Sequence, residues 1–499
     1  MAPLKLSSLV FGVLYTTLAV AGVLPPRADA PALTTAAIAI KINPQSSGST
    51  LARKALTGAQ LVEDLVSKAL QTGNITLSKR DAQFEVLPLY TSLTAEKIAE
   101  MVREAVANDP TYVPTDFGAW YQVHFSAEDA AAFESQEATL LKTLGASSDV
   151  TSAQTLAGTP IKAPQNTIKP EDDPRFKDQG YLRADGINAQ YAWGQKGGDG
   201  ANTTFCDIER GWFLTHEDLR AANIQLIAGD NIKLIRAPPP ENQALVWDHG
   251  TAVLGEIFMQ DNTLGGVGIA PKATGYVVGI SRNRNDNPPE AIMDATAALK
   301  AGDVLLLEMQ IQDNNQNYWP VEVNDAEFEA IRLATAKGIT VIEPASNGGQ
   351  NMDLPVTRFG EDTPRGFLIK GHKDFRDSGA IMVGAGSPSV PHTRLSFSNF
   401  GGRVDTYAWG TNIFTTSANF EETSIYDDFD GTSGAAPIVA GAALSIQGMV
   451  GANRGGRKLT PAEMRSMIVR GGTPSANPSS DKIGVMPNLK ALIDGGFLR

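Results

Sequence analysis

Four side chains spread along this 499-residue chain are of the types that acyl-transfer chemistry requires. Ser433 carries a hydroxyl that is a poor nucleophile at neutral pH, so a base such as His249 must accept its proton. A carboxylate such as Asp207 would then fix the imidazole tautomer and stabilise its charged form. The side-chain amide of Asn347 would donate a hydrogen bond to the developing oxyanion, beside the backbone N–H of Ser433.

The segment around Ser433 predicts the start of a helix. Ser433 follows Gly431 and Thr432 and opens a run of small and apolar residues. At a helix N-terminus, unpaired N–H groups and the helix dipole favour developing negative charge. A serine in this position is also a common helix cap, so the segment alone leaves both interpretations open.

The other three residues also have purely structural interpretations. His249 stands at the predicted start of a helix, and Asp207 could cap the loop before Gly211. Asn347 precedes two glycines, which is a strong turn signal by itself. Cys206 is interpreted as a small buried hydrophobe beside the site, and a single cysteine excludes an intramolecular disulfide.

Strands and helices must alternate to position these residues. Strands are predicted over 203–207, 275–280, 304–309, 340–342 and 380–384, and helices over 249–259, 289–300, 325–336, from Ser433 onward, and 461–469. This alternation predicts an α/β fold with a mostly parallel sheet covered by helices on both faces. In such a sheet, ligands bind at the carboxyl ends of the strands, and Asp207 stands at one of these ends.

The first residues are typical of a secretory signal. Lys5 precedes an apolar stretch over residues 9–20, and Ala19-Val20-Ala21 is a small-x-small cleavage site. We therefore predict a signal peptide over residues 1–21 and a secreted, extracellular protein. No later apolar stretch is long enough to predict a membrane span.

Three further segments precede the main α/β region. Residues 22–80, rich in Ala, Ser, Thr and Leu, predict a leader of low order that ends at the dibasic pair Lys79-Arg80. Residues 81–158 predict a small α+β domain, with strands over 84–90, 117–125 and 150–156 and helices over 94–107 and 126–144. Residues 159–178 predict a linker, and 179–499 the main domain.

The charge of the chain restricts its partners. A formal net charge of -13 and a pI near 5.0 argue against a nucleic-acid-binding protein, whose surface would be basic. The 42% hydrophobic and 19% charged content is typical of a soluble globular protein.

Four segments resemble the subtilisin-like serine peptidases (subtilases). DIERGW, DHGTAVLGEI, PASNGG and DGTSGAAP are similar to the Asp, His, oxyanion-Asn and Ser boxes of that family, and they occur in the same order. The similarity runs from about residue 180 to the end of the chain. It implies a subtilisin-like fold, a catalytic triad of Ser433, His249 and Asp207, Asn347 in the oxyanion hole, and protein or peptide substrates. It also implies that no cofactor is required and that the protein is a monomer.

The α+β domain resembles a subtilase propeptide, although the match is one strand short. Such a propeptide assists folding and then blocks the cleft, so the resemblance implies a zymogen whose own propeptide is a partner. Subtilases also often bind structural calcium through scattered carbonyls and carboxylates. No Asp-x-Asp-x-Asp-Gly loop stands in this sequence, so no metal ligand is identified from it.

Two segments depart from the pattern of the family. The Asp box usually continues with a small Ser or Thr and then Gly, whereas Ile208 and Glu209 follow Asp207. Glu209 brings a second carboxylate near the partner of the histidine, and we expect it to shift the pH response. The segment bordering the S1 pocket, normally rich in Ser and Gly, reads Leu307-Glu308-Met309-Gln310-Ile311-Gln312.

The function predicted from these residues is a secreted serine endopeptidase made as a zymogen and acting through an acyl-enzyme. One alternative is a narrow-specificity processing peptidase or peptide ligase using the same triad. A second alternative is a non-catalytic binding protein with a subtilisin fold. The acid-acting sedolisins also carry a Gly-Thr-Ser box but pair it with a Glu/Asp dyad, and His249-Gly250-Thr251 argues against them.

Overall fold

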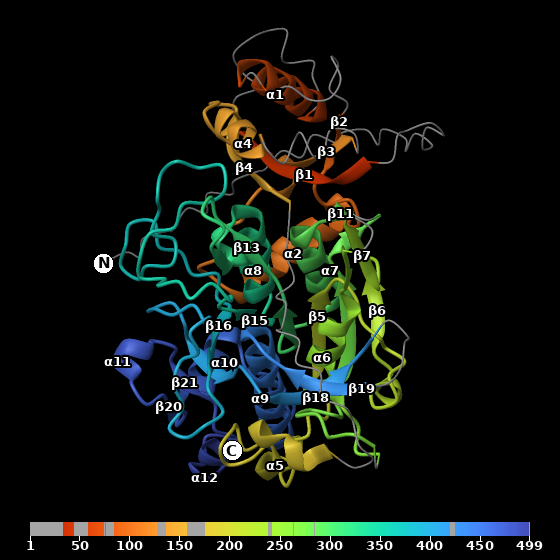
Figure 1. The fold of residues 1–499 in the computed structure, drawn as a ribbon, viewed down its shortest axis with the longest axis vertical. Helices are drawn as coiled ribbons and strands as arrows, with labels where there is room; N and C mark the ends of the chain where they lie inside the picture. Colours follow the sequence, from red (N-terminus) through yellow and green to blue (C-terminus); the bar gives the residue numbers. More distant parts are fainter. Residues whose placement is uncertain are drawn as a thin grey trace, which may run out of the picture.

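The structure analysed is a computed structural model that describes residues 33–43, 58–73, 75, 84–126, 136–156, 175–237, 242–262, 264–283, 285–419 and 425–498. It consists of an N-terminal α+β domain and a larger α/β domain (Figure 1). The predicted signal peptide over 1–21, the pair Lys79-Arg80 and most of the predicted linker over 159–178 lie outside the described residues.

The N-terminal domain contains a four-stranded antiparallel sheet in the order β2-β3-β1-β4. Its elements are β1 (Leu33–Ile42), α1 (Gly58–Thr72), β2 (Phe84–Pro88), α2 (Ala95–Asn108), η3 (Phe117–Ala119), β3 (Trp120–Ser126), α4 (Glu137–Gly145) and β4 (Val150–Thr155). The strands and the helix predicted over residues 84–125 and 150–156 are therefore present, and α2 begins after the predicted N-terminal threonine, Thr94.

The prediction that residues 22–80 are of low order is wrong for two segments, because β1 and α1 lie within them. β1 lies in the interior of the sheet. It is the strand by which the predicted α+β domain was one short. Its side chains alternate, with Ile38 and Ile40 packed against α1 and α4 and Ala37 and Ala39 in the core shared with the α/β domain. The small residues of β1 gain their burial from pairing with β3 and β4, far along the chain, which local composition does not reveal.

The α/β domain is built on a nine-stranded sheet in the order β20-β21-β17-β16-β15-β12-β5-β9-β6. Its strands are β5 (Thr204–Glu209), β6 (Gln225–Ala228), β9 (Thr274–Gly279), β12 (Val304–Leu307), β15 (Thr340–Pro344), β16 (Ile381–Gly386), β17 (Thr406–Trp409), β20 (Thr473–Pro474) and β21 (Val485–Met486). All neighbouring pairs are parallel except β20 with β21, which confirms the predicted mostly parallel sheet.

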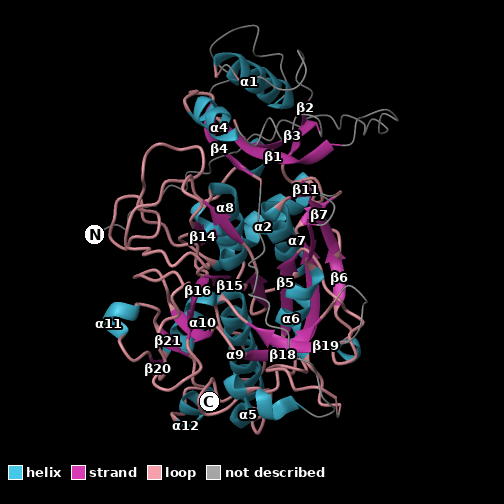
Figure 2. Ribbon diagram, in the orientation of Figure 1, coloured by secondary structure: helices cyan, strands magenta, loops and turns pink. Residues whose placement is uncertain are grey.

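Helices cover both faces of this sheet (Figure 2). The main helices are α6 (Trp247–Phe258), α7 (Pro288–Ala298), α8 (Asp325–Ala336), α9 (Thr432–Asn453) and α10 (Pro461–Val469). α7 and α8 lie on the face toward the N-terminal domain, and α6 and α9 pack against each other on the opposite face (Figure 1). Among the described helices, α9 alone is long and apolar enough to cross a membrane, and nearly all of it is buried in the domain.

Shorter elements connect this framework. They are η4 (Arg175–Asp178), η5 (Gly180–Leu182), α5 (Ala189–Ala192), η6 (Arg220–Ala222), β7 (Leu234–Ala237), β8 (Asn242–Leu245), β10 (Ser281–Arg282), β11 (Asn285–Asp286), β13 (Gln310–Gln312), β14 (Tyr318–Pro320), η7 (Val321–Val323), β18 (Ile413–Ser417), β19 (Ile425–Phe429), α11 (Pro478–Asp481) and α12 (Leu489–Asp494). One of these elements, and one strand of the nine-stranded sheet, differ from expectation. η4 occupies the end of the predicted linker, and β12 ends earlier than predicted because the N–H of Met309 turns back to the carbonyl of Leu307.

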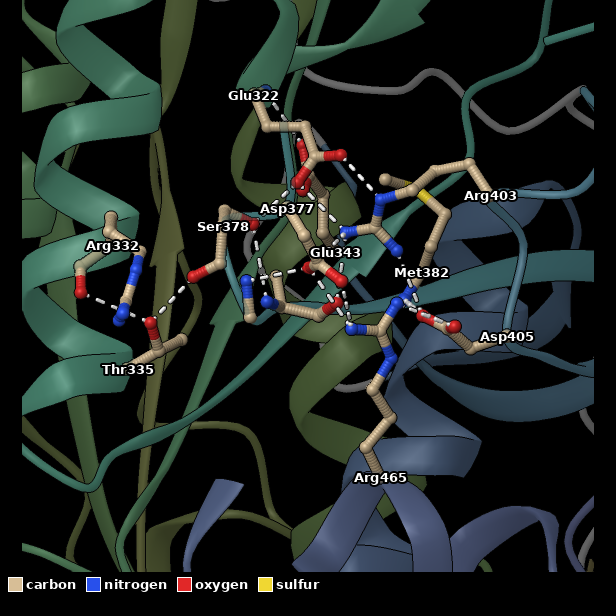
Figure 3. Close-up of polar contacts among 12 residues, drawn as sticks. Glu322, Arg332, Thr335, Glu343, Asp377, Ser378, Met382, Arg403, Asp405 and Arg465 are labelled. Carbon is tan, nitrogen blue, oxygen red and sulfur yellow. Dashed lines mark hydrogen bonds and ion pairs between the residues drawn. The ribbon is translucent and has the colours of Figure 1, made fainter. Parts of the chain in front are cut away.

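A buried ion network fixes the strands on one side of the sheet (Figure 3). The Arg403 guanidinium, fully buried, donates to both carboxylate oxygens of Glu322 at 2.7 and 2.9 Å and to Asp405 at 2.9 Å. Glu343 of β15 accepts the backbone N–H of Glu322 at 2.9 Å. The bidentate Arg403–Glu322 pair satisfies the buried charge, and the bond to Glu343 ties η7 to β15, the strand that leads to Asn347.

The N-terminal domain supplies hydrogen-bond partners at the N-termini of α7 and α8. The side-chain oxygen of Gln154 accepts the N–H groups of Asp325 and Ala326, the first two residues of α8, at 3.0 and 3.1 Å. Glu290 of α7 in turn accepts the backbone N–H groups of Thr91 and Ser92 at 2.8 Å each. Because the first N–H groups of a helix lack intrahelical acceptors, the Gln154 contacts act as a cap provided by another domain.

Charged groups on α8 add to this interface. Glu329 accepts from Lys41 Nζ at 2.7 Å and from Trp120 Nε1 at 3.0 Å. Glu327, fully buried, accepts from the side-chain amide of Gln154 at 2.5 Å. The interface therefore depends on carboxyl groups of α8 that face the N-terminal sheet.

We expect the folded chain to lose stability as the pH rises from about 4.5 to about 7, because burial raises the pKa of Glu327 to about 7. In this window the unfolded Glu327 has released its proton while the folded one still holds it, so the slope of unfolding free energy against pH is negative. In Glu327→Gln, the unfolding free energy should fall by up to about 3 kcal/mol less across this pH window than in the parent chain. The measurement is the urea midpoint of unfolding at several pH values in this window, with the full-length Ser433→Ala chain as the parent.

The matched control is Glu96→Gln on the exposed side of α2, which makes the same chemical change away from the interface. Midpoints that fall equally steeply with pH in Glu327→Gln and in the parent would show that Glu327 does not hold the proton.

Candidate active site

His249 lies in the first turn of α6, and its imidazole contacts Glu209. The atoms involved are Nδ1 of His249 and Oε1 of Glu209, and the carboxylate is fully buried. The second oxygen of Glu209 accepts the backbone N–H of Arg210 at 3.2 Å. The contact with Glu209 fixes the orientation of the His249 ring.

Asp207, which the sequence predicts as the partner of His249, does not contact it. Its Oδ2 accepts the indole N–H of Trp212 at 2.7 Å, and Oδ1 has no partner in the described part of the chain. Asp207 and Glu209 point to the same face of β5, but Glu209 is the last residue of the strand and Asp207 lies about 6.6 Å further from the carboxyl edge. Glu209 is therefore the carboxylate within reach of α6, and the predicted pairing of Asp207 with His249 is wrong.

Close backbone contacts hold α6 in place. A Cβ at Gly250 would lie 2.5 Å from the carbonyl oxygen of Gly211 and 2.7 Å from the ring of Trp212, so only glycine lets this loop pass. The hydroxyl of Thr251 accepts the N–H of Phe213 at 2.8 Å. Gly250, the residue after His249, therefore lets the loop that follows Glu209 pack against α6.

The hairpin β18–β19 supports the other side of α6. The hydroxyls of Thr415 and Thr416 donate to the carbonyls of Ala252 and Thr251, each at 2.7 Å. The ring of Phe429, at the end of this hairpin, meets His249 edge-on with the centroids 5.1 Å apart. The same hairpin leads directly into the segment that carries Ser433.

Ser433 is the second residue of α9, and its side chain is fully buried. Its backbone N–H is one of the first in the helix, which have no intrahelical acceptor. Gly431, the residue before α9, has a φ of +104°. A Cβ on Gly431 would lie 3.1 Å from Asn347 Nδ2 and 3.6 Å from both the N and Oγ of Ser433, so this glycine keeps open the space between the two candidate oxyanion donors.

Asn347 follows β15 and is oriented by the start of α9. Its side-chain oxygen accepts both the N–H and the hydroxyl of Thr432 at 2.9 Å each. Nδ2 is thereby directed toward the space beside Gly431. The backbone N–H of Asn347 donates to the side-chain oxygen of Gln310 at 3.1 Å, which joins the segments that follow β12 and β15.

The structure thus brings three of the predicted residues to one place, the carboxyl edge of the sheet. Nε2 of His249 and Oγ of Ser433 have no hydrogen-bond partner among the described residues, so the bond between them is not formed in this structure. Such bonds often tighten only when substrate binds. Cys206 is buried next to Asp207, as expected for a small hydrophobe.

Two further carboxyl groups lie beneath the site and were not predicted to belong to it. Glu256 of α6 and Glu308, just after β12, are at most 1% exposed, and neither has a hydrogen-bond partner for its carboxyl oxygens in the described chain. Burial raises the pKa of Glu256, and burial with the charges of Glu209 and Asp207 raises that of Glu308. Burial and the charge of Glu209 likewise raise the pKa of Asp207.

Within the described ranges, no group of three or more His, Cys, Asp or Glu side chains is arranged to hold a metal ion. The structural calcium implied by the family resemblance stays a prediction.

The sequence model of the subtilase family matches residues 209–484, more than half of the chain. The chain therefore belongs to the subtilase family and is a serine-type endopeptidase by class. The match begins at Glu209, so Asp207 lies outside it.

Curated relatives agree with this assignment. Subtilisin DY of Bacillus licheniformis is 25% identical over 266 residues, which cover 53% of this chain and 81% of the relative. The major intracellular serine protease of Bacillus subtilis (strain 168) is 26% identical over 285 residues, covering 57% of this chain and 80% of the relative.

A solved structure shows the same fold over almost the whole chain. The epidermin leader peptide processing serine protease of Staphylococcus aureus aligns with a TM-score of 0.52 at 15% identity and covers 93% of this chain and 99% of its own. The comparison confirms the predicted subtilisin-like fold class.

The role of Glu209 had a signal in the sequence. The Asp box of the family places a glycine two residues after its carboxylate, and Gly211 stands two residues after Glu209, not after Asp207. The prediction placed the carboxylate of the box at Asp207, two residues before Glu209. Two residues are one full period of a strand, so the side chains of Asp207 and Glu209 lie on the same face.

We expect Gly431→Ala to lower kcat by a factor on the order of 10² or more, because the added methyl group enters the space between the oxyanion donors. Gly456→Ala is the matched control. Gly456 also has a positive φ (+88°), but an added Cβ would have no heavy atom within 4 Å. Both variants carry backbone strain of about 1–3 kcal/mol, so both should lose stability and only Gly431→Ala should lose turnover. The measurement is kcat of the active-site-titrated enzymes. Equal losses of kcat in both variants would contradict the assignment of the oxyanion donors beside Gly431.

Proposed function

We propose that this subtilase is a secreted endopeptidase, made as a zymogen, whose triad is Ser433, His249 and Glu209. The observation that carries the triad is the contact between Glu209 and Nδ1 of His249, with Asp207 held instead by Trp212. A glutamate can fill the role of the aspartate because the chemistry requires a buried carboxylate at Nδ1, whichever chain length delivers it.

In the proposed reaction, Oγ of Ser433 attacks the peptide carbonyl while Nε2 of His249 takes its proton. Glu209 holds the imidazole in the productive tautomer and stabilises the imidazolium. The oxyanion receives hydrogen bonds from Nδ2 of Asn347 and the backbone N–H of Ser433. His249 then protonates the leaving amine, and water hydrolyses the resulting ester at Ser433 by the same steps in reverse.

The zymogen proposal is supported by the contacts between the two domains. The N-terminal domain provides caps and ion-pair partners to α7 and α8 through Gln154, Lys41 and Trp120. Lys79-Arg80 falls between α1 and β2, so cleavage there would divide the N-terminal domain instead of releasing it. We therefore propose that maturation cuts the chain after Leu156 and before Arg175, by the activity of Ser433.

Secretion is proposed from the signal-like residues 1–21, although two of the relatives are named as intracellular serine proteases. A monomeric state and structural calcium are likewise proposed from the family resemblance. No organic cofactor enters the proposed chemistry.

A narrow-specificity processing peptidase is a second candidate. The observation that favours it is the bond from Asn347 N–H to Gln310, whose side chain is 4% exposed. Gln310 also belongs to the hairpin β13–β14, so the segment that borders the S1 pocket in the family is already paired on one edge. Cleavage of a diverse peptide library separates the candidates, since a general endopeptidase cuts many sequences.

The carboxylate assignment is tested by comparing Glu209→Gln with Asp207→Asn. Glu209→Gln should lower kcat by a factor on the order of 10⁴, because an amide at Nδ1 favours the wrong tautomer. Asp207→Asn retains the acceptor for Trp212 and should stay within about tenfold of the wild type. Turnover of a chromogenic peptide by titrated enzyme gives the ranking. The opposite ranking would return the role to Asp207.

The nucleophile and the maturation site are tested together by Ser433→Ala. This variant should fold, fail to label with a fluorophosphonate and accumulate with its N-terminal domain attached. N-terminal sequencing of the wild-type product should begin within residues 157–175. A wild-type product beginning at 81, or a Ser433→Ala chain matured at the same position as the wild type, would overturn autocatalytic maturation in this segment.

A further inference from the structure

Four carboxyl groups lie together in the layer between the sheet and helices α6 and α9, directly beneath the candidate active site. Asp207 and Glu209 come from β5, Glu256 from α6 and Glu308 from the turn after β12, and each is at most 1% exposed. Because isolated buried carboxylates are costly, this layer cannot carry four negative charges.

The layer contains few groups that could compensate such charges. Among the described residues, no Lys or Arg forms an ion pair with Asp207, Glu256 or Glu308, and His249 is paired with Glu209. Tyr181 of η5 lies near Glu256 but supplies no positive charge, and burial raises the pKa of Tyr181 as well. The raised pKa values of Asp207, Glu256 and Glu308 agree with three protonated carboxyl groups around one carboxylate.

Glu308 is the neutral acid placed to meet Glu209. β12 and β5 are adjacent and parallel, with Leu307 opposite Ile208, so the following residues, Glu308 and Glu209, are neighbours across the two strands. The N–H of Glu308 donates to the carbonyl of Ile208 at 3.3 Å. Burial and the nearby charge of Glu209 raise the pKa of Glu308.

Asp207 and Glu256 are less suited to this contact. Asp207 is two residues earlier on the same strand, about 6.6 Å from Glu209, and Trp212 already holds one of its oxygens. Glu256 lies on α6, two helical turns beyond His249, and burial raises its pKa. Both carboxyl oxygens of Glu308 lack a hydrogen-bond partner in the described chain, as do those of Glu256, so the position of Glu308 beside β5 is what distinguishes it.

We propose that Glu308 is a positioning residue whose protonated carboxyl group donates a hydrogen bond to Glu209 and holds that carboxylate against His249. The inference rests on the proposed triad and adds the residue that orients its acid. A carboxylate that accepts a strong hydrogen bond is a weaker partner for an imidazolium. His249 consequently releases its proton at a lower pH, and the acidic limit of peptidase activity moves to lower pH.

Two substitutions separate this role from packing. Glu308→Gln keeps the shape and a neutral donor, so the acidic limb of the profile of kcat/KM against pH should stay within about 0.3 pH unit of the wild type. Glu308→Leu keeps the volume but removes the donor, so the midpoint of the limb should rise by about 1 pH unit. The measurement uses the processed, active-site-titrated enzyme and a peptide substrate.

The matched control is the pair Glu256→Gln and Glu256→Leu, which changes another buried acid of the same layer that does not face Glu209. Neither should move the acidic limb by more than about 0.3 pH unit. A titration of the His249 ring by NMR in the Ser433→Ala background gives a second readout, and its midpoint should rise in Glu308→Leu but not in Glu308→Gln. Thermal unfolding of each variant shows that it folds.

An acidic limb that stays in place in Glu308→Leu, or moves equally in Glu308→Gln, would overturn the inference. If Glu209→Gln abolishes turnover while Glu308→Leu leaves the limb unchanged, the triad stands and only the role of Glu308 falls. If Glu209→Gln leaves turnover intact, the proposed triad itself is wrong, and Glu308 loses this role with it.

Discussion

A buried carboxylate must meet a histidine at the carboxyl edge of the sheet, and the rest of the site is built around this contact. β5 extends far enough to place Glu209 at the edge, and α6 begins early enough to place His249 above it. Both groups lie away from water, where a charge is costly unless it is paired. The position of the strand end therefore decides which carboxylate contacts His249.

Close approaches of backbone hold the contact in place. Gly250 lets the loop after β5 pass against α6, and Gly431 leaves room beside Asn347. Hydroxyls of β18 donate to carbonyls of α6, so the hairpin before α9 is joined to the helix that carries His249. The Arg403–Glu322 network performs the equivalent task for β15, which leads to Asn347 (Figure 3).

The N-terminal domain contacts the opposite face of the sheet, at the ends of α7 and α8. Its contacts are both apolar and polar. Ala39 and Trp120 lie in the same hydrophobic core as residues of the α/β domain, and Gln154 and Lys41 satisfy helix N–H groups and carboxylates that would otherwise need water. Sequence composition placed the beginning of this domain too late. The residues of β1 are small and lack aromatic neighbours, and only their pairing with β3 and β4 gives them a buried environment.

The sequence by itself determined the fold class, the order of the four boxes and the positions of Ser433, His249 and Asn347 in them, since helix starts and strand periods are local properties. It predicted a strand that ends at Asp207, whereas β5 continues to Glu209, so the structure places both carboxylates on one face of the strand. Only the tertiary structure decided between them. The choice depends on how far along the strand α6 packs, and that distance is set by contacts between segments remote in sequence, such as Gly250 with Trp212.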